Sequence, residues 1–124
     1  MNHVSKFRIE VRDIDRAERF YSALFQWTLK THGEKYEAIT APTDNRGIPV
    51  IFGAINGEIA TSNNGEGSTV IFVKVDSMSQ TLSMVTAIGG KVLLPSIARS
   101  DGLYAKIEDP DGNIIGLFEE NKVS

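Results

Sequence analysis

Cysteine is absent from this sequence of 124 residues, and histidine occurs only twice. Without cysteine the chain forms no disulfide, and it offers neither a thiolate nucleophile nor a sulfur ligand for zinc or an iron–sulfur cluster. A metal site in such a chain has to rely on carboxylates. The first eleven residues also lack the apolar segment of a secretory signal peptide. We therefore expect a cytoplasmic protein without a disulfide framework.

The sequence also has no large excess of positive or negative charge and no long run of apolar residues. Thirteen Lys and Arg stand against 16 Asp and Glu, a net charge of −3, so the chain has no field that would hold a polyanion. No segment approaches the roughly 18 consecutive apolar residues of a membrane-spanning helix. We expect neither nucleic acid nor a membrane as a partner. The remaining composition, 41% apolar and 23% charged, is typical of one globular domain.

The first part of the chain has the pattern of a strand followed by a helix. Apolar and charged residues alternate over residues 6–12, which is the period of a half-buried strand. After Asp13 and Asp15, either of which can cap a helix, apolar residues recur at spacings of three and four over residues 17–24. Apolar segments bounded by turn residues then predict strands at 27–31, 36–41 and 48–55.

The same order repeats 64 residues later, so that Phe7 overlays Ile71. A strand at 71–75 leads into a helix capped by Ser77 or Ser79. Strands are predicted to follow at 91–94, 103–108 and 113–118. The sequence thus predicts one pseudo-duplicated α+β domain over residues 1–124, with module one at about 6–56, a linker at about 57–67 and module two at about 68–119. The predicted core is Phe7, Ile9, Val11, Phe20, Tyr21, Leu24, Ile71, Val73, Val75, Val85, Ile88, Ile115 and Leu117.

Three phrases of the sequence, FRIEVRDIDRAERFYSALFQW, GGKVLLP and DPDGNIIGLFE, resemble the vicinal oxygen chelate superfamily of glyoxalase, bleomycin-resistance and extradiol-dioxygenase-like proteins. The likeness is greatest to short, two-module glyoxalase-like members and covers residues 7–119. It implies two βαβββ modules whose curved, mostly antiparallel sheets enclose a cleft, with the helices outside. Small members of this superfamily often pair, so the resemblance also implies a homodimer.

Metal enzymes of the superfamily take a ligand, usually His, from the first strand of each module and a carboxylate from the last strand of each. Carried over to this sequence, these positions fall on Lys6, Val70 and Gly116, with the fourth near Phe52 or Gly53. An ammonium group repels a divalent cation, and the other side chains offer no donor atom. We therefore expect the metal centre of the family to be absent and no cofactor to be bound.

The two histidines do not lie on a predicted strand that faces the cleft. His3 is near the terminus and His32 falls in a turn before Gly33, so we expect both to be solvated. A metal site of another kind that uses them is left open.

The ligand parity of the resemblance also predicts which side chains face the cleft. The candidate ligand-binding residues are Lys6, Arg8, Glu10, Phe52, Val70, Phe72, Lys74, Tyr104, Lys106 and Phe118. One interpretation is that the charges coat the wet face of a half-buried sheet. The other is a cationic and aromatic pocket for a small anionic or planar ligand, in which Arg8 holds a carboxylate through two hydrogen bonds.

Two functions follow from these candidates. The first is a protein that binds a small organic molecule, anionic or aromatic, without the metal of the family. The alternative is a metal-independent lyase or isomerase that acts on a small metabolite through Lys, Arg, Glu or Tyr. The missing metal ligands favour the first, and the sequence assigns no catalytic residue.

Overall fold

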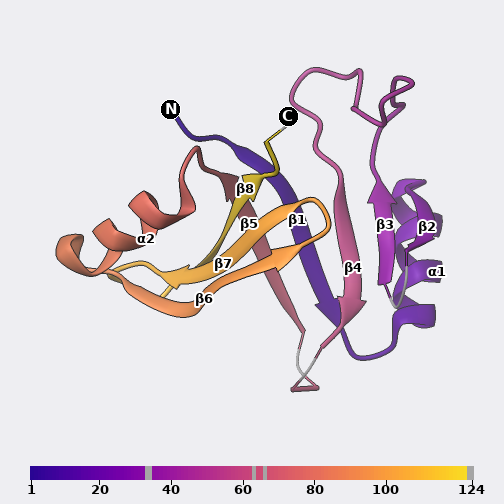
Figure 1. The fold of residues 1–124 in the computed structure, drawn as a ribbon. Helices are drawn as coiled ribbons and strands as arrows, with labels where there is room; N and C mark the ends of the chain where they lie inside the picture. The colour runs from indigo at the N-terminus through magenta and orange to yellow at the C-terminus, as the bar shows by residue number, and fades with distance from the viewer. Residues whose placement is uncertain (33–34, 63, 66, 123–124) are drawn as a thin grey trace. The chain divides into compact units, whose positions relative to one another are not determined.

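The computed structural model describes residues 1–32, 35–62, 64–65 and 67–122. They form two compact units, which we call the first module (Lys6–Thr69) and the second module (Val70–Ser124 with Met1–Ser5). Each has the element order β-α-β-β-β in the described part of the chain (Figure 1). The α+β fold of two βαβββ modules predicted from the sequence is therefore confirmed.

The first module holds one helix and four strands among its described residues. These are β1 (Val4–Val11, with its first two residues counted in the second module), α1 (Ile14–Phe25), β2 (Thr28–His32), β3 (Lys35–Ile39) and β4 (Gly57–Thr61). The strand order is β2-β3-β4-β1. β4 runs parallel to β1 and the other two pairs are antiparallel. A parallel pair needs a long crossover connection, which α1, β2 and β3 provide here.

Helix α1 begins where the alternating pattern of β1 ends. The Asp13 carboxylate caps it by accepting a hydrogen bond of 3.0 Å from the Arg16 backbone N–H. The helix ends at Gln26, whose left-handed backbone (φ 57°) lets its N–H bond back to the Ser22 carbonyl. One stripe of α1, centred on Ala17, packs against buried Ile59 of β4 and so forms the core of the module.

Four residues of the predicted core are exposed, so that part of the prediction is wrong. Phe20 and Leu24 are 55% and 54% exposed, and Ile71 and Ile88 are exposed too. On α1 the stripe that faces the sheet includes Ala17 and Tyr21. Phe20 and Leu24 share the same spacing of four but lie on the neighbouring flank, and spacing alone does not say which flank meets the sheet.

The strand predicted at residues 48–55 is also wrong. Its first residue, Ile48, closes a turn in which the Asp44 carboxylate accepts hydrogen bonds from the backbone of Arg46 and Ile48, and a second turn follows in which Ala54 N–H donates to the Ile51 carbonyl. The fourth strand is β4, which lies in the segment predicted to be a linker; positions 63 and 66 of that segment fall outside the described residues. Gly57 fits opposite Phe7 because a Cβ there would come within 2.5 Å of the Phe7 ring.

The second module repeats this arrangement. Its elements are β5 (Ser68–Lys74), α2 (Met78–Val85), the 3-10 turn η1 (Thr86–Ile88), β6 (Lys91–Arg99), β7 (Gly102–Glu108) and β8 (Ile114–Glu120). The strand order is β5-β8-β7-β6, with β5 and β8 parallel and the other pairs antiparallel. The core consists of Val75, Met78, Ala105 and Leu117.

The helix caps show how closely the two modules correspond. Ser77 caps α2 by accepting from the Gln80 backbone N–H, and it lies 64 positions after Asp13, the cap of α1. The overlay predicted from the sequence is thus reproduced by the helices. Gly89 (φ 97°) then closes the helical segment in the left-handed conformation. Neither helix in the described part of the chain is long and apolar enough to cross a bilayer.

Candidate functional site

In the first module, the sheet face opposite α1 carries charged side chains. Phe7 and Ile9 pack with the core beneath α1, so the alternation of β1 places Arg8 and Glu10 on the other face. The parallel register sets Arg8 opposite Glu58 of β4. Lys35, the first residue of β3, reaches the same carboxylate. We call Arg8, Glu10, Lys35 and Glu58 the ion-pair network.

Every member of the ion-pair network is engaged with another. Arg8 donates from Nε to Glu10 Oε2 (3.0 Å) and from Nη1 to Glu58 Oε1 (2.7 Å). Lys35 Nζ donates to Glu58 Oε2 at 2.6 Å. The Glu58 side chain is only 12% exposed, and the network balances two positive against two negative charges. It therefore holds three strands together on a partly buried face.

The surroundings of Glu58 keep its carboxyl group ionised. Burial raises the pKa of this group, but hydrogen bonds from Lys35 and Arg8 outweigh burial and hold the pKa below its usual 4.5. A carboxylate of this kind is a weak general base near neutral pH, since its proton affinity is low. Its chemistry suits the positioning of Arg8 and Lys35 better than proton transfer.

In the second module, the face opposite α2 is aromatic. Val73, Leu103 and Leu117 pack with the α2 core, so their neighbours in sequence point the other way. The ring centroids of Tyr104 and Phe118 lie 4.8 Å apart, and Phe72 meets Tyr104 edge-on at 5.7 Å. We call these three residues the aromatic cluster.

Two further contacts fix the aromatic cluster. The Tyr104 hydroxyl donates to Asp101 Oδ2 at 2.7 Å, which orients the ring. Gly116 lies opposite Phe72 on β8, and a Cβ at Gly116 would come within 2.4 Å of the Phe72 ring. The absence of a side chain at position 116 therefore makes room for Phe72.

The remaining candidates lie in different settings. Lys74 pairs with Glu120, Lys106 and Lys6 are half-buried, and Val70 is buried. Phe52 is fully exposed in the turn segment before β4 and belongs to neither group of residues. The structure thus brings together Arg8 with Glu10 in the first module, and the three aromatic residues in the second.

Glu58 is the functional candidate that sequence reasoning missed. The fourth carboxylate position was expected near Phe52 or Gly53, and β4 shows that expectation to be wrong. Arg8 opposes Glu58 as Phe72 opposes Gly116, so Glu58 is the counterpart of Gly116. The alternation of polar Glu58 with apolar Ile59 was the available signal, hidden by the glycine before it.

The residues at the superfamily's ligand positions do not fit a metal ion. Lys6, Val70 and Gly116 provide no ligand, and Glu58 is already held by two cations. Within the described ranges, no three His, Asp or Glu side chains gather in a way that could hold a metal. His3 is exposed, and His32 is the last residue of β2 rather than part of a turn.

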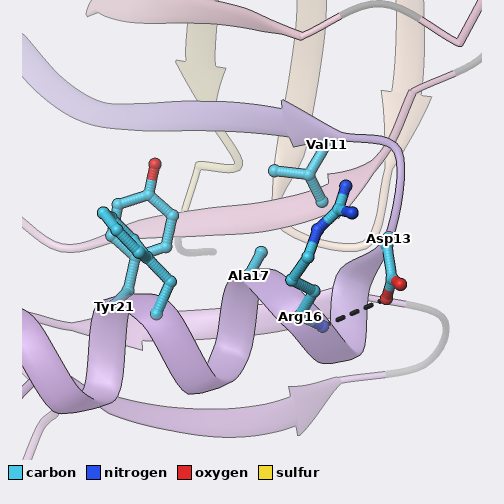
Figure 2. Close-up of a pocket in the computed structure, with 6 residues that line it drawn as sticks. Val11, Asp13, Arg16, Ala17 and Tyr21 are labelled. Atoms are coloured by element: carbon cyan, nitrogen blue, oxygen red, sulfur yellow. Dashed lines mark hydrogen bonds between the residues drawn. The ribbon is translucent and has the colours of Figure 1, made fainter.

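Two hollows lie beside the end of β1 in the first module. One of about 250 Å³ is lined by Val11, Asp13, Arg16, Ala17, Phe20 and Tyr21 (Figure 2). The other, of about 430 Å³, includes Glu10 and Ser68. Asp13 in the first is used as the helix cap, and Glu10 in the second is bound by Arg8. Glu10 alone among the candidates predicted from the sequence lines a described hollow.

Both the sequence and the fold of this chain are similar to those of known proteins. A model of the glyoxalase-like domain matches residues 6–118. The chain belongs to the glyoxalase-like domain family. Its membership of the vicinal oxygen chelate superfamily, inferred above as a resemblance, is confirmed by this match and by structural neighbours. No curated protein matches this glyoxalase-like domain significantly.

Solved structures share the fold of this glyoxalase-like domain at low identity. A hypothetical protein from Bacillus halodurans has a TM-score of 0.68 at 14% identity, covering 99% of this chain and 97% of its own. A Streptomyces coelicolor methylmalonyl-CoA epimerase in complex with 2-nitronate-propionyl-CoA has a TM-score of 0.65 at 17% identity, and the match covers 98% of this chain and 99% of that one. The Mn(II)-bound glyoxalase from Novosphingobium aromaticivorans has a TM-score of 0.63 at 16% identity, and the match covers 100% of this chain and 44% of that one.

Proposed function

We propose that this glyoxalase-like domain binds a small organic molecule with an aromatic or apolar body and an anionic group, without a metal ion. The observation that carries the proposal is the aromatic cluster, which lies on a sheet face away from the helix. Ligand sites are mostly apolar, with few polar groups that orient the ligand. The complex of a structural neighbour, methylmalonyl-CoA epimerase, with methylmalonyl-CoA supports small-molecule binding on this fold.

Within the first module, Arg8 is the polar residue that we propose for ligand binding. Its guanidinium carries five N–H donors, and the bonds to Glu10 and Glu58 use only part of this set. Loss of a charge-assisted hydrogen bond from a partly enclosed site costs roughly 1.5 to 3 kcal/mol. Replacing Arg8 should therefore weaken binding about tenfold to a hundredfold.

Binding rather than catalysis is favoured by the acid–base groups. Backbone hydrogen bonds lower the pKa of Asp13 and Asp44, and a side-chain hydrogen bond from Asn113 lowers that of Asp109. Together with Glu58, these are carboxylates held ionised by caps, turns and ion pairs. A general acid or base is instead tuned toward the working pH.

The test is thermal stabilisation by defined probes, since a ligand bound only by the native state raises the melting temperature. Benzoate, phenylpyruvate and methylmalonyl-CoA are suitable probes. Tyr104→Leu should abolish stabilisation by the probe that binds, whereas Phe25→Leu, an exposed aromatic outside the cluster, should not. Equal stabilisation of both variants would overturn the proposed site.

We also propose that residues 1–124 form one domain, as the sequence predicts. Thermal unfolding of the full chain should then show a single cooperative transition. Two separate transitions would contradict this proposal. Chemical conversion of a bound probe would favour the alternative, a metal-independent lyase or isomerase.

Metal independence has its own test. Elemental analysis of purified protein should find no stoichiometric zinc, nickel, iron or manganese, and chelators should leave the melting temperature unchanged. One metal ion per chain would refute the proposal.

The assembly proposed is a homodimer. Phe20, Leu24 and Phe25 leave apolar area on α1 exposed, and β2 and β6 each have an unpaired edge within their own module, which pairing could cover. Light scattering should give twice the chain mass of 13.6 kDa. A mass near that of one chain at tens of micromolar would count against it.

A further inference from the structure

The chain contains two Asn–Gly pairs, Asn56–Gly57 and Asn64–Gly65, in contrasting environments. An asparagine followed by glycine is prone to deamidation, because glycine has no side chain to hinder attack by its own backbone nitrogen on the preceding amide. The reaction requires that the asparagine side chain and the following peptide can approach each other. The rate of deamidation of an Asn–Gly pair therefore depends on the structure around it.

Asn64–Gly65 lies between β4 and β5. Both residues are exposed, and Gly65 adopts φ +75° with no atom within 4 Å of an added Cβ. The buried Ser62 hydroxyl donates to Asn64 Oδ1 at 2.7 Å. A donor on this oxygen stabilises the negative charge that develops there when a nucleophile attacks Cγ.

Asn56–Gly57 differs in the setting of its glycine rather than in a donor to the asparagine side-chain oxygen. Asn56 Oδ1 accepts a hydrogen bond of 3.1 Å from the Thr40 backbone N–H. Gly57 is buried in β4, in register with Phe7. Bringing the Gly57 nitrogen onto the Asn56 side chain would require β4 to leave the sheet.

We propose that Asn64 is a site of spontaneous deamidation assisted by Ser62, while Asn56 is protected by the fold. The Gly65 nitrogen forms a bond to Asn64 Cγ, the bond from Cγ to Nδ2 breaks, and Nδ2 leaves as ammonia with the proton from Gly65. Water then opens the cyclic imide. Cleavage at Cγ gives aspartate, and cleavage at the main-chain carbonyl carbon gives isoaspartate.

Either product changes the main chain between β4 and β5. Both replace a neutral amide by a carboxylate, which makes the net charge more negative by one. Isoaspartate also adds a methylene group to the main chain. The site would thus mark the age of the protein by a change of charge and of chain geometry.

The experiment is ageing of the purified full chain at physiological temperature and mildly alkaline pH, followed by peptide mass spectrometry and an isoaspartyl methyltransferase assay. We expect aspartate and isoaspartate at Asn64 and unchanged Asn56. Asn64→Ser should abolish the product, and Asn56→Ser should leave its rate unaltered. In denaturant, both asparagines should convert at comparable rates, which would show that the fold causes the difference.

Ser62→Ala is the variant that isolates the hydroxyl. It should slow conversion of Asn64 several-fold in the native protein and have no effect in denaturant. Conversion of Asn56 as fast as Asn64 in the native protein, or an unmodified Asn64, would overturn the proposal. An unchanged rate in Ser62→Ala would overturn the assistance by Ser62.

Discussion

Replacing Glu58 by glutamine tests whether the ion-pair network stabilises the first module. Glutamine keeps the shape of the side chain but removes the charge that Arg8 and Lys35 share. Arg8 would retain Glu10 as a partner, whereas Lys35 has no other described carboxylate within 4 Å. The loss therefore falls on two charge-assisted hydrogen bonds of a carboxylate that is 12% exposed.

The expected loss in the free energy of unfolding follows from the burial of the Glu58, Arg8 and Lys35 side chains. A hydrogen bond to a charged group contributes about 1.5 to 3 kcal/mol. The Arg8 and Lys35 side chains are 25% and 38% exposed, so water recovers part of the loss, and we expect about 2 kcal/mol for Glu58→Gln. With an unfolding entropy of about 2.1 cal/mol/K per residue, this lowers the melting temperature by roughly 8 °C.

The assay is thermal unfolding at neutral pH, with Glu37→Gln as the matched control. Glu37 lies opposite Glu58 on β3, but it is exposed and makes no ion pair within the described part of the chain. The control should shift the melting temperature by a degree or so at most, as surface changes do. Equal effects of the two variants would show that the network adds no stability.

The pH dependence gives a second check of the same reasoning. The pKa of Glu58 is lower in the folded chain than its usual 4.5, so its contribution to stability is complete above that pH. The contribution is lost as the pH falls through the folded value. The difference between wild type and Glu58→Gln should therefore shrink in acid. A deficit that stays constant down to low pH would refute the electrostatic explanation.

Two further substitutions test the turns and the aromatic cluster. Gly116→Ala places a Cβ within 2.4 Å of the Phe72 ring. Chemical denaturation should therefore show a loss of roughly 1 to 3 kcal/mol in the free energy of unfolding. The control is Gly67→Ala, which should be nearly neutral because the nearest atom to its added Cβ lies 3.7 Å away. Asp109→Ala removes hydrogen bonds to the backbone and side chain of Asn113, so hydrogen exchange at the Asn113 amide should become faster, and unchanged exchange would contradict a structural role for this carboxylate.

Local signals in the sequence predicted the repeated strand–helix units. Alternation over residues 6–12 and the caps at Asp13 and Ser77 depend on neighbouring residues only. Contacts with distant parts of the chain therefore do not alter these signals. The same alternation agrees with the packing of Phe7 and Ile9 of β1, and of Val73 of β5, with the cores beneath the helices.

Long-range pairing decided what the sequence could not predict. Residues 48–55 are more apolar than residues 57–61, so composition favoured the wrong segment as the fourth strand. β4 exists because it pairs with β1 on one side and β3 on the other, and its Gly57 is acceptable only because Phe7 occupies the space. Glu58 was missed for this reason, since its partners are 50 and 23 positions away.

The two modules show that a repeated backbone does not keep repeated chemistry. Arg8 opposite Glu58 and Phe72 opposite Gly116 occupy equivalent places in the parallel ladders of their modules. In the first module the pair is an ion pair, and in the second a ring fills the space that a side chain on β8 would need. A carboxylate introduced at Gly116 would collide with Phe72 before it could meet a metal ion. Restoring a ligand there would thus require a simultaneous change on β5, so the aromatic cluster and a metal site of the superfamily's type exclude each other at this position.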